Sequence, residues 1–383
     1  MAHKIREVYI VHHSHTDVGY TDLQEQVIYN QANNIRRAVE LIADGLEKGT
    51  NQKGLKWNCE TWYCVEQFLK VATKEEKKTF FDLVKKNSIG LSANYLNFND
   101  LADCEYLISR LDIDPDIINH TPNVKFWQRW GAGFDHVDLK AWGERGIPIA
   151  TCPGVNSGIV AELAIMLMLA GYRNLLQINR QLRAGHWPRT EYFGRSFMIK
   201  GKTVGVLGLG HIGKKVAALA TAFGANVIYY DIVRQTEQEE KFGYRFVDFD
   251  TLLRESDIYT IHCPLNEETR GMIGAEQFAQ MKPTAMLINT ARGPIVDEAA
   301  LIDALTTGKI ATAGLDTYER EPLPKDHPLL TLDNVVASAH AGGNTKDNDI
   351  NMVNYVYHNI VAFDRGEPLN TPGDIVNGEY LKK

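Results

Sequence analysis

The segment that most constrains the fold of this 383-residue chain lies just past its middle, at residues 203–231. It reads TVGVLGLGHIGKKVAALATAFGANVIYYD, which is an apolar run, a glycine-rich turn, an amphipathic stretch, a second apolar run and an acid. The hydrophobic period changes from that of a strand to that of a helix and back again. This pattern predicts a βαβ unit of the dinucleotide-binding, Rossmann type.

Three glycines and one acid give this unit its predicted chemistry. Gly208 permits the tight turn, Gly210 lets the backbone approach a pyrophosphate, and Gly213 lets the helix pack on the strand. The helix N-terminus offers N–H groups and positive potential to the phosphates. Asp231 ends the second strand, where a carboxylate accepts hydrogen bonds from both ribose hydroxyls and repels a 2′-phosphate. We therefore expect NAD rather than NADP, although Arg234 lies close enough to weaken that preference.

Further strand-then-loop segments follow, and three of their loops carry Arg292, Glu321 and His340. Loops at the carboxyl ends of parallel strands line the ligand crevice in such sheets. An arginine can bind a carboxylate or carbonyl oxygen in bidentate fashion. A histidine can donate a proton to a carbonyl oxygen as hydride arrives, and a neighbouring glutamate favours its imidazolium form. Together these residues predict reduction of a 2-keto acid.

The rest of the chain alternates strand-like and helix-like segments, as in α/β folds. Before residue 112 we expect strands at REVYIV, LKWNCET and SIGLSANYL, with helices over 23–46 and 73–86. The stretch 112–122, rich in prolines and turn formers, predicts a domain boundary. A mostly buried helix is expected over 159–176, followed at 173–200 by an arginine- and aromatic-rich arm over a neighbouring subunit, or by a long surface loop.

Composition limits the partners and the location. A net charge of −7 and a pI near 6.0 argue against nucleic acid or an anionic membrane as partner. The five cysteines lack the close-paired spacing of a zinc ribbon and predict free thiols. The first apolar run after Met1 is too short for a secretory signal, so we expect a cytoplasmic protein.

From about residue 114 to 376 the chain resembles the D-isomer-specific 2-hydroxyacid dehydrogenase family. The resemblance rests on GAGFDHVDL, PGVNSGIVAELAIMLML, VLGLGHIGKKVA, HCPLNEETRGMI, INTARGPIVDEAAL, AGLDTYEREPL and SAHAGGNT, in that order. It implies a Rossmann domain beside a smaller flavodoxin-like domain, with NAD as cofactor and a 2-keto or 2-hydroxy acid as substrate. It also implies a homodimer with the arm 173–200 in its interface.

The resemblance implies the site residues as well. The catalytic set is Arg292, Glu321 and His340. Substrate contacts are implied for Gly131, Ala132, Gly133, Asn156 and Arg292. Cofactor contacts are predicted for Gly208, Gly210, His211, Ile212, Gly213, Asp231, Cys263, Pro264, Thr269, Thr290, Ala291, Asp316, His340 and Gly342.

The first 112 residues do not resemble the start of that family. HSHTDVGYT, WNCETWYCVEQFL and IGLSANYLNFND resemble instead the N-terminal part of the α-mannosidase-type glycoside hydrolases. That resemblance implies zinc ligands at His15 and Asp17, with Asp100 as third ligand and nucleophile. The fourth ligand has no counterpart in this chain, so His15 and Asp17 are otherwise ordinary loop residues at a strand end.

These observations predict three parts. Residues 1–112 are a hydrolase-like βαβαβ fragment, 113–155 with 341–383 are the remnant of the substrate domain, and 156–340 are the NAD-binding domain. The fragment is expected to dock beside a strand at 124–129, with a C-terminal helix at 351–365 covering the sheet. Two further interpretations stay open: an NAD-binding but catalytically impaired fusion protein, and a zinc-dependent hydrolase fragment.

Overall fold

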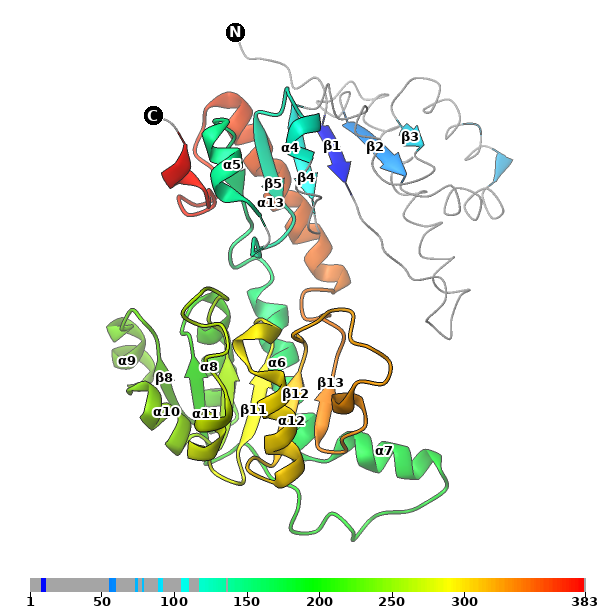
Figure 1. The fold of residues 1–383 in the computed structure, drawn as a ribbon, viewed down its shortest axis with the longest axis vertical. Helices are drawn as coiled ribbons and strands as arrows, with labels where there is room; N and C mark the ends of the chain where they lie inside the picture. Colours follow the sequence, from blue (N-terminus) through cyan, green and yellow to red (C-terminus); the bar gives the residue numbers. More distant parts are fainter. Residues whose placement is uncertain are drawn as a thin grey trace. The chain divides into compact units, whose positions relative to one another are not determined.

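The protein divides into two compact units, which are described separately (Figure 1). One holds the described residues up to Pro153 and those from Asn351 onward, and the other spans Gly154–Ile350. The computed structural model describes residues 8–11, 55–59, 89–91, 105–109, 117–135 and 137–381, with single positions at 73, 74 and 78.

The sheet of the Gly154–Ile350 unit is parallel throughout and has the order β13-β12-β11-β10-β7-β8-β9. Its strands are β7 (Thr203–Leu207), β8 (Asn226–Tyr230), β9 (Arg245–Phe246), β10 (Ile258–Ile261), β11 (Met286–Asn289), β12 (Thr312–Leu315) and β13 (Val335–Ala337). The strand order reverses between β7 and β10, as in doubly wound dinucleotide-binding folds, so the predicted Rossmann-type fold is confirmed.

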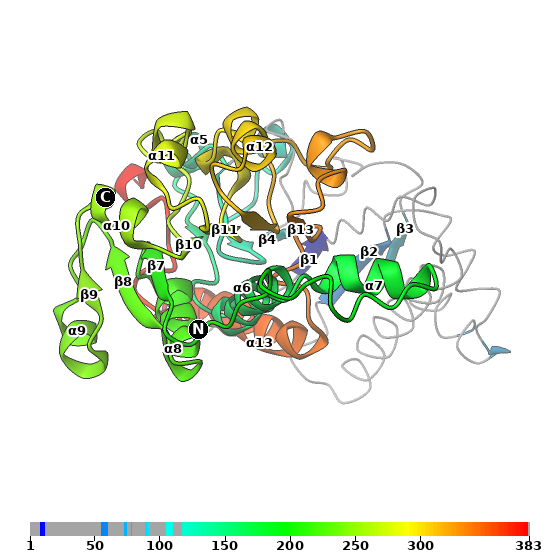
Figure 2. The same cartoon turned by 90° about the horizontal axis from the view of Figure 1, so that it is seen from below.

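Helices cover both faces of this sheet, which explains why its strands are almost wholly apolar (Figure 2). The helices α6 (Ser157–Tyr172) and α8 (His211–Ala222) lie on one face; α10 (Phe249–Glu255), α11 (Ala275–Gln280) and α12 (Glu298–Thr307) lie on the other. In β11, Met286 and Ile288 pack on the α6–α8 side, whereas Leu287 packs on the opposite side. Alternate residues of one strand thus fill two separate cores.

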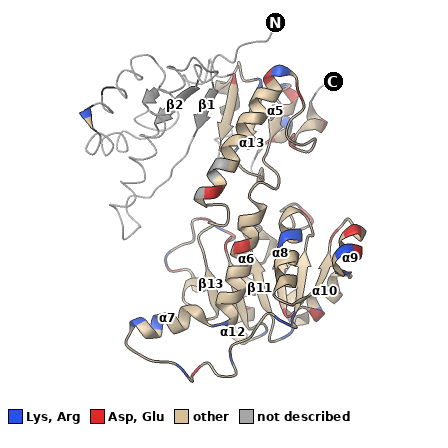
Figure 3. Ribbon diagram, turned by 180° about the vertical axis from the view of Figure 1, so that it is seen from behind, with Lys and Arg blue, Asp and Glu red and all other residues tan. Residues whose placement is uncertain are grey.

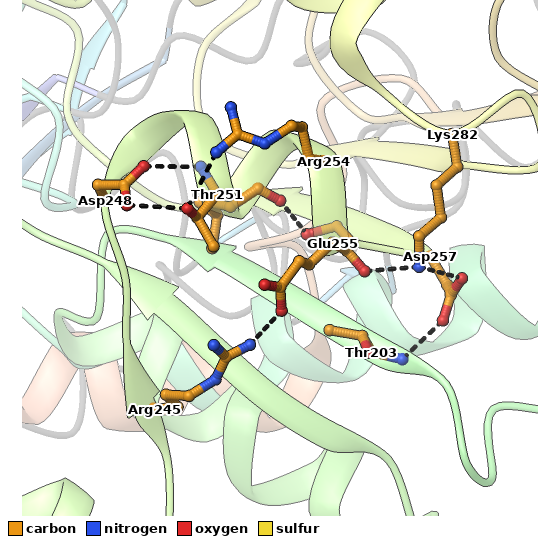
Figure 4. Close-up of polar contacts among 10 residues, drawn as sticks. Thr203, Arg245, Asp248, Thr251, Arg254, Glu255, Asp257 and Lys282 are labelled. Carbon is orange, nitrogen blue, oxygen red and sulfur yellow. Dashed lines mark hydrogen bonds and ion pairs between the residues drawn. The ribbon is translucent and has the colours of Figure 1, made fainter.

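A polar cluster joins β7 to β10 at their amino ends (Figure 4). Asp257, which precedes β10, accepts hydrogen bonds from the Thr203 backbone N–H at 2.8 Å and from Lys282 Nζ at 2.8 Å. Burial raises the pKa of Asp257, but the bonds from Lys282 and Thr203 outweigh it and leave that pKa below its ordinary value. These contacts lie at the amino-terminal edge of the sheet, whereas the loops that carry the predicted site lie at its carboxyl-terminal edge.

The predicted helix over 159–176 is two helices. α6 ends at Tyr172, and α7 (Leu175–Arg183) begins after Asn174, whose φ of 52° breaks the helical path. The arm at 173–200 therefore begins as a helix instead of a wholly extended segment. Leu175, Ile178 and Leu182 recur at helical spacing, a signal that the surrounding arginines obscured.

The other unit contains six described strands in the order β3-β2-β1-β4-β5-β6, all parallel. They are β1 (Val8–Val11), β2 (Leu55–Cys59), β3 (Ile89–Leu91), β4 (Tyr106–Ser109), β5 (Phe126–Arg129) and β6 (Ile149–Ala150), with the short helices α4 (Ile117–His120) and α5 (Leu139–Glu144). Without the edge strand β3, this is the flavodoxin-like order 2-1-3-4-5.

The three strands predicted before residue 112 are confirmed, and so is the predicted place of the fragment beside the strand at 124–129. β1 pairs with β4, which also belongs to residues 1–112, and β4 pairs directly with β5. β4 is a four-residue strand that the sequence did not reveal. The helices expected over 23–46 and 73–86 fall almost entirely outside the described residues.

The helix α13 (Lys346–Arg365) covers this sheet, as predicted. Phe363 stacks on Phe126 of β5 with ring centroids 4.4 Å apart. Asn359, wholly buried, donates to Gln128 Oε1 at 3.0 Å and to Asp374 Oδ2 at 2.9 Å. The buried side-chain amides of Asn359 and Gln128 are hydrogen-bonded to each other, and a shift of α13 would leave them unpaired. This contact therefore fixes one orientation of the helix.

Among the described helices, none is by itself long and apolar enough to cross a membrane. α6 and α7, which meet at a bend of 63°, pass that test of length and composition only as a pair.

Candidate active site

The glycine turn between β7 and α8 is built as the sequence predicts. Gly208 has a φ of 90°, and a Cβ there would lie 2.7 Å from the backbone nitrogen of Cys263. A Cβ on Gly213 would lie 2.0 Å from the carbonyl oxygen of Gly208, so only glycine allows α8 to approach the turn. Gly210 differs, because a Cβ there would meet no described atom within 4 Å.

The open space at Gly210 fits a dinucleotide. Gly210 is the N-cap residue of α8 and contributes no side-chain cap, so the first N–H groups of this twelve-residue helix are left to an external acceptor. A pyrophosphate supplies such acceptors and matches the positive end of the helix dipole. The residues at this turn therefore fit NAD.

Asp231 follows β8 and faces the same turn. Its Oδ2 accepts from the Leu209 N–H at 2.6 Å, and its Oδ1 accepts from the Val233 N–H at 3.1 Å. These bonds fix the carboxylate beside the glycine turn while each oxygen keeps a second lone pair for a ribose hydroxyl. Arg234, expected to weaken the NAD preference, is paired with Glu239 through two bonds of 2.9 and 2.8 Å.

The remaining predicted cofactor residues lie in loops at the same edge. Cys263 and Pro264 follow β10, and Thr269 Oγ1 closes their loop by donating to the Pro264 carbonyl oxygen at 2.7 Å. Thr290 Oγ1, after β11, is buried and has no hydrogen-bond partner among the described residues. An orphaned hydroxyl at this edge is what a ligand with polar atoms would satisfy. His211 and Ile212 open α8, with the His211 ring against Gly154.

Asn289, which the sequence did not single out, positions the loop that carries Arg292. Its side-chain Nδ2 donates to the Arg292 carbonyl oxygen at 2.9 Å, and its Oδ1 accepts from the Ala291 N–H at 3.0 Å. Gly293 lets this loop touch the next one, since a Cβ there would lie 1.9 Å from the carbonyl carbon of Tyr318. The sequence does show an asparagine at the end of a strand, where this residue is typical of turns. Its two hydrogen bonds, however, are visible only in the structure.

Glu321 and His340 form a direct contact. His340 Nδ1 lies 2.7 Å from Glu321 Oε2, and Glu321 Oε1 accepts from the Tyr318 N–H at 2.9 Å. His340 has a φ of 49°, in the left-handed region that non-glycine residues seldom adopt. Backbone strain of this kind accumulates at functional sites, where surrounding bonds hold it in place.

Asp316 supplies those surrounding bonds. This residue, 2% exposed at the end of β12, accepts from Ser338 Oγ at 2.6 Å and from the Ala341 N–H at 2.8 Å through Oδ1. Its Oδ2 accepts from the Gly342 N–H at 2.9 Å, and its backbone oxygen accepts from the His340 N–H at 2.8 Å. Asp316 was predicted to lie near the nicotinamide; in the structure its carboxylate clamps the turn that presents His340.

The electrostatics of the pair follow from these contacts. The hydrogen bond to Glu321 raises the pKa of His340 above its ordinary value, and burial and the charge of Arg292 offset only part of that effect. Burial raises the pKa of Glu321, but the bonds from His340 and the Tyr318 N–H outweigh it and leave that pKa lowered. These shifts favour the imidazolium form of His340 and the carboxylate form of Glu321, and the charge of Arg292 acts on both groups.

The predicted substrate residues lie in both units. Gly131, Ala132 and Gly133 follow β5; the Gly131 carbonyl oxygen accepts from the Cys152 N–H at 2.8 Å, and the Gly133 carbonyl oxygen accepts from Arg129 Nε at 3.3 Å. Asn156 belongs to the other unit, where it precedes α6 and lies beside Gly343. Asn156 is thus brought to the His340 turn.

The predicted zinc ligands His15, Asp17 and Asp100 lie outside the described residues. Within the described part of the chain, no group of three or more histidine, cysteine, aspartate or glutamate residues is arranged to hold a metal ion.

Comparison with known proteins agrees with this geometry. Residues 165–342 match the family model of the D-isomer specific 2-hydroxyacid dehydrogenase NAD binding domain. A glyoxylate reductase from Korarchaeum cryptofilum is 39% identical over 284 residues, which are 73% of this chain and 85% of the relative. The chain belongs to the D-isomer specific 2-hydroxyacid dehydrogenase family. As a member of that family it is an NAD-dependent oxidoreductase of 2-hydroxy acids, which confirms the function and the cofactor predicted from the sequence.

Other relatives of this dehydrogenase are similar over comparable stretches. A D-3-phosphoglycerate dehydrogenase from Archaeoglobus fulgidus is 42% identical over 261 residues, and the chain spans about half (49%) of that relative. The crystal structure of D-lactate dehydrogenase from Aquifex aeolicus, complexed with NAD and lactic acid, superposes with a TM-score of 0.69 at 28% identity, covering 80% of this chain and 98% of that one. That share exceeds what residues 113–383 alone supply, so the likeness to the dehydrogenases begins before the predicted boundary.

Proposed function

We propose that this dehydrogenase interconverts a small 2-keto acid and its D-2-hydroxy acid, with His340 as the acid and base. The observation that carries the proposal is the 2.7 Å contact between His340 Nδ1 and Glu321 Oε2, within reach of the Arg292 charge. Since Nδ1 is bonded to the carboxylate, Nε2 is the ring nitrogen that remains for the substrate oxygen. General acid catalysis of this kind contributes about 10²–10⁴-fold to the rate.

Arg292 is assigned to the substrate. Its guanidinium can bind the carboxylate of the acid in bidentate fashion, which orients the adjacent carbonyl group. The Asn289 bonds to the Ala291 N–H and the Arg292 carbonyl oxygen fix the backbone from which this side chain projects. Arg292 therefore contributes to positioning, and its positive charge stabilises the negative charge that grows on the carbonyl oxygen.

The cofactor is assigned to the glycine turn. When bound, NADH supplies the hydride that is added to the carbonyl carbon. The chain's own part is to hold the pyrophosphate at Gly210 and the first turn of α8, and the ribose at Asp231. His340 then delivers its proton to the carbonyl oxygen, which leaves a neutral imidazole beside the Glu321 carboxylate.

Glyoxylate is the first substrate to test, because relatives named glyoxylate reductase are similar over most of their length. The Gly131–Gly133 backbone, by family resemblance, meets the substrate carboxylate, and Asn156 lies near the reacting groups.

NADH oxidation measured against glyoxylate, hydroxypyruvate, pyruvate and longer 2-keto acids tests the proposal. We expect turnover with at least one short acid and a loss of about 10²–10⁴-fold in kcat/KM for His340→Ala. Arg292→Ala should raise KM for the acid while leaving the Kd for NADH unchanged. Tight NADH binding without turnover of any acid would favour the catalytically impaired interpretation instead.

We also propose that the protein forms a homodimer and is cytoplasmic. The arm at 184–200 and α7 expose several large apolar side chains, among them Trp187 at 79% and Phe193 at 75%, which supports a homodimer formed through this arm. A cytoplasmic location is supported by the free thiols Cys152 and Cys263 among the described residues.

The origin of the first 112 residues is also part of the proposal. Their sequence motifs support descent from an α-mannosidase-type hydrolase, and the pairing of β1 with β4 supports a present role as strands of the dehydrogenase. Elemental analysis of the purified protein for zinc separates this role from retained metal binding at His15 and Asp17: a stoichiometric zinc content would contradict a purely structural fragment.

A further inference from the structure

Arg234 and Glu239 form a closed pair beside the ribose-binding acid. Arg234 Nε lies 2.9 Å from Glu239 Oε1, and Arg234 Nη2 lies 2.8 Å from Glu239 Oε2. This is the fork-to-fork geometry in which an arginine satisfies a whole carboxylate. The guanidinium also lies over the Phe246 ring, 5.4 Å from its centroid. Arg234 is thus held by a charge on one side and an aromatic face on the other.

Glu239 is itself fixed from the core. The helix α9 (Thr236–Phe242), which carries both acidic and basic residues in Figure 3, presents Glu239 to the buried strand β8. Tyr229, which is 0% exposed, donates its hydroxyl to Glu239 Oε1 at 2.7 Å and accepts from the Gln235 N–H at 2.8 Å. The hydrogen bond from Arg234, followed by that from Tyr229, lowers the pKa of Glu239 to about 2. The Glu239 carboxylate is therefore ionised at neutral pH.

The position of the Arg234–Glu239 pair near Asp231 determines how it affects cofactor binding. Arg234 lies three residues after Asp231, in the loop where a cofactor's adenosine ribose binds in this fold. In NADP-dependent enzymes an arginine in this loop accommodates the 2′-phosphate. Here, to meet such a phosphate, Arg234 would have to leave Glu239, and the Glu239 carboxylate would then lie near the phosphate without its counter-charge.

We propose that Glu239 is a specificity-determining residue that excludes NADP by holding Arg234 away from the 2′ position. Asp231 repels a 2′-phosphate directly, and Glu239 withdraws the guanidinium of Arg234, which would otherwise compensate for that repulsion. Two acids thus set the preference for NAD: Asp231 meets the ribose, and Glu239 acts through Arg234 without touching the cofactor. This inference rests on the assignment of the NAD site to the Gly208–Gly213 turn and Asp231.

Binding of NADH and NADPH, measured separately by calorimetry on the full chain, tests the proposal independently of turnover. We expect Glu239→Ala to tighten NADPH binding about tenfold and to change NADH binding less than about twofold. Glu239→Gln, which keeps one acceptor for Arg234, should give a smaller gain. The gain should fall as salt is added, because it is electrostatic.

The double variant Glu239→Ala/Arg234→Ala is the decisive control. If Arg234 is the group released, the gain in NADPH affinity must vanish in the double variant, and Arg234→Ala alone must give no gain in NADPH affinity. An unchanged NADPH affinity in Glu239→Ala, or a gain that persists without Arg234, would overturn the proposal. Thermal denaturation of each variant shows that the fold is kept. Failure of the wild type to bind NADH would instead overturn the cofactor site itself.

Discussion

His340 Nδ1 and Glu321 Oε2 lie 2.7 Å apart, although the two residues come from different loops of the sheet's carboxyl edge. The contact exists because β12 and β13 are adjacent parallel strands, so the loops that follow them meet. Neither side chain is deeply buried: His340 is 50% exposed and Glu321 35%. Both side chains are therefore open to proton exchange with a bound substrate or with solvent.

The first prediction concerns pH. The raised pKa of His340 keeps the ring protonated to higher pH than an ordinary imidazole. Reduction, which consumes that proton, should hold at low pH and decline as pH rises through this pKa, while oxidation of the hydroxy acid should rise over the same range. Glu321→Gln removes the largest cause of the raised pKa, so the decline in kcat/KM for reduction should move to lower pH.

The matched control for this experiment is Glu319→Gln. Glu319 is exposed and lies two residues from Glu321, but it contributes nothing to the pKa shift of His340. Its pH profile should coincide with that of the wild type. Equal displacement of both profiles would mean that net charge, and not the contact with Nδ1, sets the pKa.

The second prediction concerns the clamp under His340. Asp316→Ala leaves three donors, on Ser338, Ala341 and Gly342, without their acceptor inside the fold. We expect a loss of about 3 kcal/mol or more in the free energy of unfolding, since each unpaired buried group costs about 1–3 kcal/mol. Activity should fall further than stability alone explains, because the strained turn at His340 would relax.

Chemical denaturation gives the free energies for that comparison. Asp303→Ala serves as its control, because the Asp303 side chain is half exposed and pairs with Lys309 at the surface. Its removal should change the free energy of unfolding by less than about 1 kcal/mol. A loss for Asp316→Ala as small as that for Asp303→Ala would show that the clamp is dispensable.

The third prediction separates two glycines of the same turn. Gly210→Val adds a side chain where no described atom lies within 4 Å of its Cβ, so the fold should be unaffected while NADH binding is lost. Gly213→Ala places a Cβ 2.0 Å from the Gly208 carbonyl oxygen, so the free energy of unfolding should fall by about 1–3 kcal/mol. Calorimetric NADH titration and thermal denaturation of both variants distinguish the effects. Retained NADH affinity in Gly210→Val would contradict the placement of the pyrophosphate.

The βαβ unit at 203–231 shows what the sequence predicts well. Its turn glycines and alternating hydrophobic periods are local, and α8 and β8 follow the predicted pattern. β4, which is no shorter than β1, was missed; its strand conformation is stabilised by pairing with β1 and β5, neither of which adjoins it in the sequence. Long-range pairing overrides weak local propensity in such short strands.

The site shows the same division. Arg292, Glu321 and His340 could be predicted because each ends a strand-and-loop segment, and parallel strands bring such loops to one edge. The hydrogen bonds that hold these residues in place could not be predicted from the sequence. Asp316 clamping the His340 turn, and Glu239 holding Arg234, depend on distances between loops that no residue pattern encodes. These are also the contacts on which pKa and specificity depend.

The fourth prediction concerns the arm. Trp187 and Phe193 are more exposed than large apolar side chains of a monomer usually are, and Leu175 at the start of α7 is also exposed, at 54%. If a second copy covers these side chains, sedimentation velocity should show a dimer for the wild type. The double variant Trp187→Glu/Phe193→Glu should shift it to the monomer, because burying two carboxylates without partners costs more than the apolar contacts return.

The control for the arm is Val353→Glu. Val353 is 49% exposed on α13, in the other unit, and so tests whether any added charge on an exposed apolar position weakens association. It should leave the dimer intact. A wild type that sediments as a monomer at micromolar concentration would contradict the assignment of the arm to an interface. A dimer that survives the double variant would place the interface elsewhere on the chain.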